Sequence, residues 1–133
     1  MKQVKIIECP RDAMQGIKTF IPTEKKVAYI QSLLRVGFDT IDFGSFVSPK
    51  AIPQMQDTAE VLARLDLSRT ESKLLAIIAN TQGAEIASKH KEIQCLGYPF
   101  SISENFQMRN THKTIAESII TLQEILNIAD ASN

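Results

Sequence analysis

Short apolar runs alternate along the chain with stretches of helical periodicity, and this alternation constrains the fold more than any other feature. The runs suited to strands are residues 4–9, 40–43, 73–79 and 92–97. The amphipathic stretches between and after them are residues 24–37 with Thr23 as N-cap, 54–64, 81–90, and a last helix opened by Thr111 or Thr114. Strands that alternate with helices, without hairpin signals, predict an α/β fold with a parallel sheet and right-handed crossovers.

Two architectures fit four βα units in 133 residues. One is a small, open, doubly wound sheet, and the other is half of an eight-stranded barrel, which typically takes about 250 residues. Periodicity does not choose between them. In both, ligands bind at the carboxyl ends of the strands, and polar residues follow each strand here. They are Arg11, Asp12 and Gln15, then Asp42 and Ser45, then Asn80 and Gln82, then Ser101, Glu104 and Asn110.

Composition narrows the function classes. Fifteen basic residues balance fifteen acidic ones, so nothing favours a nucleic-acid partner or a membrane surface. The five glycines form no nucleotide-binding loop. No apolar run approaches the roughly 18 residues of a membrane span, and the first residues show no secretory signal. Cys9 and Cys95 are interpreted as free thiols, so we expect a cytoplasmic protein.

An Arg-Asp pair directly follows the first apolar run. Asp12 could ligate a hard divalent cation through oxygen, and Arg11 could stabilise an enolate oxygen. A structural ion pair at the strand end accounts for the two residues equally well. Asp42 stands in an otherwise apolar strand, so we expect it to face a polar mouth or to pair with Arg11. In either case Arg11, Asp12 and Asp42 should converge at one end of the sheet.

Three segments carry a resemblance to a known family. They are Pro-Arg-Asp-x-x-Gln at 10–15, Ser-Phe-Val-Ser-Pro-Lys-x-x-Pro-Gln-Met-x-Asp at 45–57, and, more weakly, Ser-Glu-Asn-Phe-Gln-Met-Arg-Asn at 103–110. The chain thereby resembles the 3-hydroxy-3-methylglutaryl-CoA (HMG-CoA) lyases, a branch of the metal-dependent TIM-barrel lyases and acyltransferases. The resemblance implies that residues 1–133 are the N-terminal half of a TIM-barrel catalytic domain, with four βα units of an incomplete (β/α)8 barrel.

The same resemblance implies a site. It makes Asp12 the one ligand in this half for Mg²⁺ or Mn²⁺, Arg11 the group that stabilises the enolate, and Asp42 the residue near the substrate hydroxyl. The substrate-binding residues that it implies are Gln15, Ser45, Lys50 and Asn110; Lys18 and Lys50 are candidates for contacts with CoA phosphates or ordinary surface lysines. The family's other metal ligands, a His-x-His pair and an asparagine, and its catalytic cysteine belong to later strands. His90 and His112 lack ligand spacing and are expected at the surface.

The implied activity is retro-Claisen cleavage of a 3-hydroxyacyl-CoA, which for HMG-CoA gives acetoacetate and acetyl-CoA. The full-length enzyme is expected to be a homo-oligomer, and the 133 residues alone are expected to be inactive. The chain departs from the family where Cys9 and Ala13 replace glycines and where Asp42 replaces a glutamate. A carboxyltransferase, a Claisen-type synthase of the same barrel family and a non-catalytic half-barrel that binds a ligand are the alternatives.

A half barrel has two open edges, at its first and fourth strands. Val4, Ile6, Ile93 and Cys95 are apolar residues on these edges. Open apolar edges pair with other chains, so the sequence predicts that the chain by itself dimerises or aggregates, or that it is folded only as part of a longer chain. In the alternative, the last helix folds over the gap and gives a stable monomer.

Overall fold

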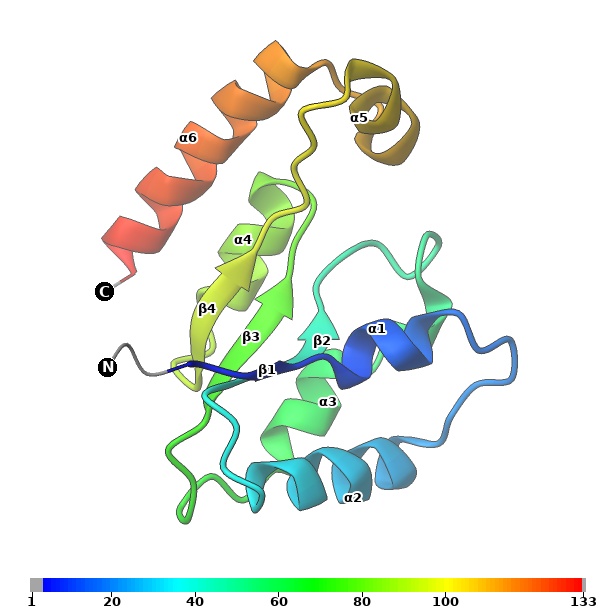
Figure 1. Ribbon diagram of the computed structural model, residues 1–133, viewed down its shortest axis with the longest axis vertical. Coiled ribbons are helices and arrows are strands. Elements are labelled where there is room, and N and C mark those ends of the chain that lie inside the picture. The colour runs from blue at the N-terminus through cyan, green and yellow to red at the C-terminus, as the bar shows by residue number, and fades with distance from the viewer. Residues whose placement is uncertain (1–3, 133) are drawn as a thin grey trace.

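The computed structural model describes residues 4–132, and its centre is one parallel sheet of four strands in the order β1-β2-β3-β4 (Figure 1). The strands are β1 (Ile7–Glu8), β2 (Thr40–Ser45), β3 (Lys73–Ile77) and β4 (Ile93–Gly97). The helices are α1 (Pro10–Gln15), α2 (Thr23–Leu34), α3 (Thr58–Ala63), α4 (Thr81–Ala87), α5 (Glu104–Thr111) and α6 (Ile115–Ala131), with a short 3₁₀ turn η1 (Pro53–Met55). The predicted α/β class is confirmed.

Strand order decides between the two architectures. Each strand pairs in parallel with the strand that follows it in the chain. A doubly wound sheet reverses direction at a switch point, where its ligand site forms. No reversal occurs among the described strands, and successive right-handed crossovers in one direction place their helices on the same face of the sheet. This is the winding of a (β/α)8 barrel.

The core lies between the outer face of the sheet and its covering helices. Strand β2 contributes Ile41 and Phe43, and β3 contributes Leu74 and Ala76. Their partners on α2 and α3 are Ile30, Leu34, Val61 and Leu62. The stripe predicted for the helix after Thr23 is therefore confirmed at its centre. A second, smaller cluster joins Ile78 and α4 to Ile125 of α6.

The first strand is shorter and more exposed than the sequence predicted. The run 4–9 was expected to be a buried strand, but only Ile7–Glu8 pairs with β2, and Val4 and Ile6 are largely exposed. The reason is that β1 is an edge strand with no neighbour on its other side. Pro10 then starts α1, which the sequence analysis did not predict, and proline suits the first turn of a helix.

Two expectations about helix starts were wrong. Thr23 is not an N-cap, because the capping position is Pro22 and the Thr23 hydroxyl donates instead to Asp57. The helix predicted at 54–64 is divided into η1 and α3, and this division rotates the buried face. The helical period of 54–64 predicts four inward residues, of which two are buried and two exposed. Met55 and Leu62 are buried as predicted, Ala59 and Ala63 are exposed, and Thr58 and Val61 are buried in their place.

The last helix of the chain is only partly buried. Helix α6 starts at a capping box in which Thr114 and Glu117 bond each other's backbone N–H. Its predicted apolar stripe is only partly covered, since Ile119 and Leu126 are about half exposed. Figure 1 shows α6 lying along the β4 side of the molecule, with no element on its outer side. Among the described residues, no helix is long and apolar enough to cross a membrane.

Candidate active site

An ion pair joins the ends of β1 and β2. Because α1 begins directly after β1, Arg11 lies in its first turn and reaches the inward-facing Asp42 of β2. Arg11 Nε donates to Asp42 Oδ1 and Oδ2, both at 3.1 Å, and Nη2 donates to Oδ2 at 2.6 Å. This forked contact uses the planar guanidinium in a way that lysine could not. The predicted convergence of Arg11 with Asp42 is confirmed.

Two more residues of α1 complete the cluster. Arg11 Nη1 donates to Gln15 Oε1 at 2.8 Å and to Asp12 Oδ1 at 3.3 Å. Gln15 Nε2 donates to the same Asp12 oxygen at 3.2 Å. The spacings of three and four residues place these side chains on one face of the short helix. We call Arg11, Asp12, Gln15 and Asp42 the strand-end cluster.

Burial divides the strand-end cluster into an inner and an outer part. The side chain of Asp42 is 5% exposed and that of Arg11 12%, whereas Asp12 is 66% exposed. Burial raises the pKa of Asp42, and Arg11 opposes this rise. The pKa of Arg11 is raised, because its bonds to Asp42 outweigh the opposing effect of burial, so the guanidinium stays charged. The cluster therefore holds a buried pair with one open side at Asp12.

Cys9, which stands at the end of the first apolar run and would be buried in a central strand, is a free thiol as predicted. It is exposed, because β1 has a free edge. Its pKa is raised, first by desolvation and then by the negative charge of Asp42, although Arg11 acts in the opposite direction. A thiol with a raised pKa is a poor nucleophile at neutral pH, so the strand-end cluster does not activate Cys9.

Asp12 has the chemistry of one ligand of a hard cation. Its Oδ1 accepts the two bonds within the cluster, and the carboxylate is otherwise open to solvent. Mg²⁺ takes six oxygen ligands. Within residues 4–132, no group of three or more His, Cys, Asp or Glu side chains could hold a metal. Among the described residues, Asp12 therefore fits one position of a divalent cation's shell without belonging to a cluster of three or more such side chains.

The other predicted site residues lie apart from the cluster. Ser45 is buried at the end of β2, where its hydroxyl accepts from the Val47 N–H, and it lines a separate groove between α3 and α4. Lys50 is exposed in the turn after β2. Asn110 is exposed on α5, which Figure 1 places at the far end of the molecule from α1. The structure brings Gln15 into contact with Arg11, whereas Ser45, Lys50 and Asn110 lie apart from the cluster.

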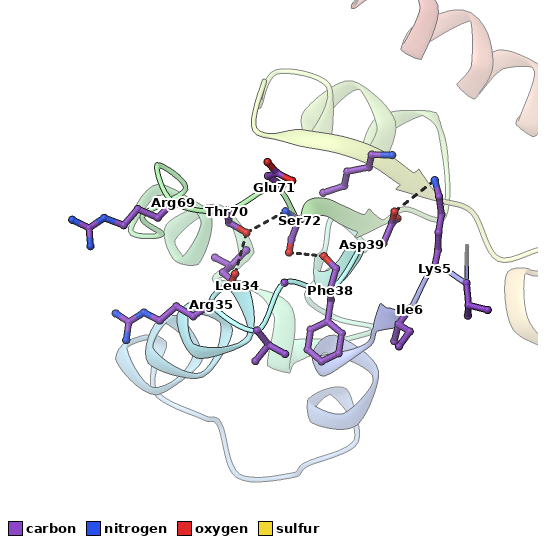
Figure 2. Close-up of a pocket in the computed structure, with 14 residues that line it drawn as sticks. Lys5, Ile6, Leu34, Arg35, Phe38, Asp39, Arg69, Thr70, Glu71 and Ser72 are labelled. Atoms are coloured by element: carbon purple, nitrogen blue, oxygen red, sulfur yellow. Dashed lines mark hydrogen bonds and ion pairs between the residues drawn. The ribbon is translucent and has the colours of Figure 1, made fainter. Parts of the chain in front are cut away.

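A larger groove of about 620 Å³ opens at the opposite end of the sheet (Figure 2). It is formed by the segments that precede β1, β2 and β3, which is the stabilising rather than the catalytic end of such folds. Its polar groups bond to each other. The Ser72 hydroxyl donates to the Phe38 carbonyl at 2.6 Å, and Lys5 pairs with Asp39 at 3.6 Å.

A second buried network was missed by the sequence analysis. Lys26 of α2 is 2% exposed and pairs with Asp57 at 2.6 Å. Its ammonium group also donates to the Gln54 carbonyl and lies 4.1 Å from the centre of the Phe20 ring. Thr23 donates to the second Asp57 oxygen at 2.8 Å. The available signal was a lysine at an i−4 position from the buried Ile30, on the apolar side of the predicted helix.

Gln54 extends this network to the loop that follows α1. Its side chain donates to the carbonyls of Ile17 and Thr19, at 2.8 and 3.0 Å, and accepts from the Ile21 N–H at 2.9 Å. Gln54 and Asp57 both belong to the segment 45–57 that carries the family resemblance. We call Thr23, Lys26, Gln54 and Asp57 the latch network, because they tie residues 17–21 to the segment after β2.

These features define a class of protein. A sheet wound as the first four units of a (β/α)8 barrel carries a buried Arg-Asp pair and an open carboxylate at the carboxyl ends of its first two strands. In barrels of this kind, the catalytic groups lie at the carboxyl ends of the strands. The class is that of TIM barrels, represented here by part of the barrel.

Comparison with known proteins makes the class specific. No protein-family model matches the chain. It is 37% identical over 134 residues to the mitochondrial hydroxymethylglutaryl-CoA lyase of Bos taurus, covering 98% of this chain and 40% of that protein. It is 32% identical over 133 residues to the cytoplasmic 3-hydroxy-3-methylglutaryl-CoA lyase of Rattus norvegicus, covering 98% of this chain and 38% of that one.

Solved structures give the same result as the sequence comparison. The HMG-CoA lyase of Bacillus subtilis superposes with a TM-score of 0.91 at 33% identity, covering all of this chain and 44% of that one. The HMG-CoA lyase of Acinetobacter baumannii, solved with coenzyme A and 3-methylmalate, gives 0.85 at 34% identity, covering 92% and 40%. By sequence and fold the chain is similar to the N-terminal part of the HMG-CoA lyases. It spans about 40% of the curated relatives' length, and the predicted partial barrel is confirmed.

Proposed function

We propose that residues 1–133 form the N-terminal half of the catalytic domain of a carbon–carbon lyase. The reaction is retro-Claisen cleavage of a 3-hydroxyacyl-CoA, with HMG-CoA cleaved to acetoacetate and acetyl-CoA. The observation that carries the proposal is the strand-end cluster, in which Arg11 and Asp42 meet at the mouth of the barrel beside the exposed Asp12. Homology to lyases of this reaction supports it.

Each residue of the cluster has a role in this reaction. Asp42 binds the C3 hydroxyl, and its raised pKa suits a group that receives a proton. Arg11, held charged and oriented by Asp42 and Gln15, donates to the enolate oxygen that forms when the C–C bond breaks. Gln15 fixes the guanidinium by accepting from Nη1. The guanidinium is already fixed by these bonds, so its remaining Nη2 N–H meets the negative charge without having to reorganise.

The cation and the coenzyme complete the proposal. Asp12 supplies one oxygen ligand to Mg²⁺ or Mn²⁺, and the cation when bound adds positive charge beside the developing enolate. Lys50, on the exposed turn after β2, contacts a CoA phosphate, while Ser45 and Asn110 line the substrate path. The A. baumannii relative was solved with coenzyme A, which supports an acyl-CoA substrate. The complete enzyme is a homo-oligomer of the cytoplasm; both cytoplasmic and mitochondrial relatives exist.

A chimera tests the activity directly. Residues 1–133 replace the matched part of the B. subtilis HMG-CoA lyase, which covers 44% of that chain. We expect the chimera to release acetyl-CoA and acetoacetate from HMG-CoA in the presence of Mg²⁺, and Asp12→Asn to remove the dependence of the rate on added Mg²⁺. The matched control is Asp66→Asn, which changes an exposed aspartate in a distant loop and should leave that dependence unchanged.

Other outcomes separate the alternatives. A folded chimera that condenses acetyl-CoA with a 2-oxo acid, without cleaving HMG-CoA, would instead assign a Claisen-type synthase. A folded chimera without either activity would leave a non-catalytic binding module as the function of this half. For the 133 residues alone, calorimetric titration with Mg²⁺ should give no binding heat, because Asp12 is a single ligand.

A further inference from the structure

Strand β2 has one extra residue relative to β3, and it directly follows Asp42. Asp42 pairs with Leu75 and Gly44 pairs with Ala76, so Phe43 has no partner residue on β3. Such a bulge bends a strand and changes the direction of its side chains, and bulges are frequent next to active sites. Here Phe43 packs into the core beneath the helices, while Asp42 faces the other side and reaches the guanidinium of α1. The direction of the Asp42 carboxylate therefore depends on how the bulged end of β2 is held.

Thr58, the first residue of α3, holds this strand end from the helix side. Its hydroxyl accepts from the Ser45 N–H at 3.1 Å and donates to the Met55 carbonyl at 2.8 Å. Within residues 4–132, β1 pairs with β2 only at Thr40 and Ile41, so beyond the bulge β2 has a strand partner on one side and depends on helix contacts elsewhere. Thr58 is 4% exposed, so removing its hydroxyl would leave buried backbone groups unpaired.

The absence of a side chain at Gly44 makes room for Thr58. A Cβ atom at Gly44 would lie 2.5 Å from the Thr58 methyl carbon Cγ2 and 2.9 Å from Thr58 Oγ1, well inside the separation at which carbon atoms attract each other. The Thr58 side chain therefore packs directly on the backbone of the bulge. The break between η1 and α3 places a threonine at this inward position.

We propose that Thr58 is a positioning residue for the strand-end cluster. Its side chain fixes the bulged end of β2 and thereby the direction in which Asp42 meets the guanidinium of Arg11. Thr58 acts through the backbone groups that it bonds, so the contacts with substrate belong to Arg11 and Asp42. The expected effect on turnover rests on the proposed lyase function, whereas the expected effect on the Arg11–Asp42 contact does not.

Thr70 offers a matched control at the opposite end of the sheet. Its hydroxyl donates to the Leu34 carbonyl at 3.0 Å and accepts from the Ser72 N–H at 3.1 Å (Figure 2). Thr58 and Thr70 thus make the same two kinds of bond, and valine at either position keeps the branched shape and removes both. Thr58→Val and Thr70→Val should each lower the urea midpoint of the chimera, but only Thr58→Val should affect the strand-end cluster.

Turnover of the chimera gives the first test. Thr58→Val should lower kcat about tenfold and change KM less than about twofold, because a displaced Arg11 fork is felt in the transition state. Thr58→Ser, which keeps the hydroxyl, and Thr70→Val should both stay within about twofold of the unmodified chimera. In an Arg11→Lys background, Thr58→Val should lower kcat less than about twofold further, because the fork that it positions is already lost. Fully additive losses would make Thr58 a purely structural residue and would overturn the inference.

Gly44→Ala tests the same contact from the strand side and serves if Thr58→Val does not fold. The new methyl group crowds Thr58, so kcat should again fall about tenfold. Adding Thr58→Ser removes the Cγ2 atom that the methyl group meets first and should restore at least about threefold of the loss. A Gly44→Ala chimera with unchanged kcat would contradict the inference.

Proton exchange at Arg11 gives a test that requires no activity. In the chimera with isotope-labelled arginine, the Arg11 Nε–H resonance is the one that Arg11→Lys removes, and its exchange with water reports the bonds to Asp42. Exchange should be about tenfold faster in Thr58→Val or Gly44→Ala and unchanged in Thr58→Ser and Thr70→Val. Unchanged exchange in the first two variants would overturn the inference. Faster exchange in a folded chimera without lyase activity would support the inference and reject the proposed function instead.

Discussion

The molecule contains two buried pairs of opposite charge that are alike in distance and unlike in surroundings. Arg11 and Asp42 approach to 2.6 Å at the carboxyl ends of β1 and β2, and Lys26 and Asp57 approach to 2.6 Å behind them. The Lys26 ammonium group donates to Asp57 and to the Gln54 carbonyl, both within the latch network, and the Phe20 ring lies over it. Arg11 instead also contacts Asp12, which is 66% exposed.

The difference shows which pair a ligand can reach. A buried pair that is fully enclosed by protein groups holds elements together, whereas a buried pair with an exposed carboxylate on one side can exchange contacts with a substrate or cation. The ion-pair distance does not make this distinction. The segment 45–57 carries the resemblance to the lyases together with the segment 10–15. It nevertheless contributes Gln54 and Asp57 to the latch network and none of its residues to the strand-end cluster.

The largest expected effect on stability comes from breaking the enclosed Lys26–Asp57 pair. Lys26→Met leaves Asp57 buried without its counter-charge, so we expect the free energy of unfolding to fall by about 3–5 kcal/mol. Urea denaturation at a fixed protein concentration measures it. Lys25→Met, at the exposed neighbouring position, should cost less than about 0.5 kcal/mol. The double variant Lys26→Met/Asp57→Leu should regain most of the loss; if it does not, the pair contributes more than charge compensation.

For Arg11 we expect a large effect on turnover and a small effect on the free energy of unfolding. In the chimera, Arg11→Lys should lower kcat about a hundredfold or more, because lysine keeps the charge but loses the fork that holds Asp42, Gln15 and the enolate oxygen. The unfolding free energy should change by less than about 1 kcal/mol. Arg64→Lys, at a partly exposed arginine on the surface, controls for the substitution itself. Near-normal turnover of the Arg11 variant would make this pair structural like the other.

The pH dependence of stability should distinguish Asp42 from exposed carboxylates. Burial raises its pKa above the ordinary 3.8, so the folded state retains a proton that the unfolded state has lost. Its contribution is therefore present below pH 3.8 and lost as pH rises through the folded pKa. Glu24, Asp39, Asp66 and Glu117 have lowered pKa values and lose their contributions as pH falls.

Comparing the chain with the Asp42→Asn variant isolates the contribution of Asp42 to the pH dependence of stability. Urea denaturation of the chain and of Asp42→Asn across acid and neutral pH gives two stability curves, and the other four carboxylates contribute to both. The stability of the chain relative to Asp42→Asn should fall with rising pH. A difference that rises instead would mean that Arg11 outweighs burial and holds Asp42 ionised.

The sequence predicted the parts of the molecule that local pattern determines. Alternating apolar runs located β2, β3 and β4 within a few residues, and an Arg-Asp pair after one strand together with an acid inside the next predicted the strand-end contact. These succeed because parallel strands align their carboxyl ends, which brings Arg11 to Asp42 without further information. The resemblance then favoured the barrel over the open sheet, and the strand order confirmed it.

The parts that the sequence did not predict depend on contacts between distant segments. Helix α1 occupies only six residues, too few for a periodic signal. Thr23 has the residue type of a cap, but Asp57, 34 positions later, accepts from its hydroxyl. Which residues of α3 face inward depends on the break at residues 56–57. A single continuous helix, as the sequence pattern predicted, does not contain this break. Ser45 and Asn110 resembled pocket residues, yet nothing in their spacing specifies the distance to Arg11.

The smallest effect on stability should come from Gln54, the residue of the latch network that bonds to the loop after α1. Gln54 is 3% exposed, and its amide makes three bonds to the backbone of residues 17–21. Gln54→Ala removes all three, but the freed loop groups can turn to water, so we expect a loss of only about 1–2 kcal/mol. The loss should be local: the Ile21 amide should exchange about ten times faster while β2 and β3 amides are unchanged. Gln56→Ala, at an exposed position two residues later, should change neither.

In the chimera, turnover should fall less than tenfold, because Arg11 keeps its contacts with Asp42 and Gln15. A loss as large as that of Arg11→Lys would show that the enclosed network positions the strand-end cluster, and that the two buried pairs act as one unit.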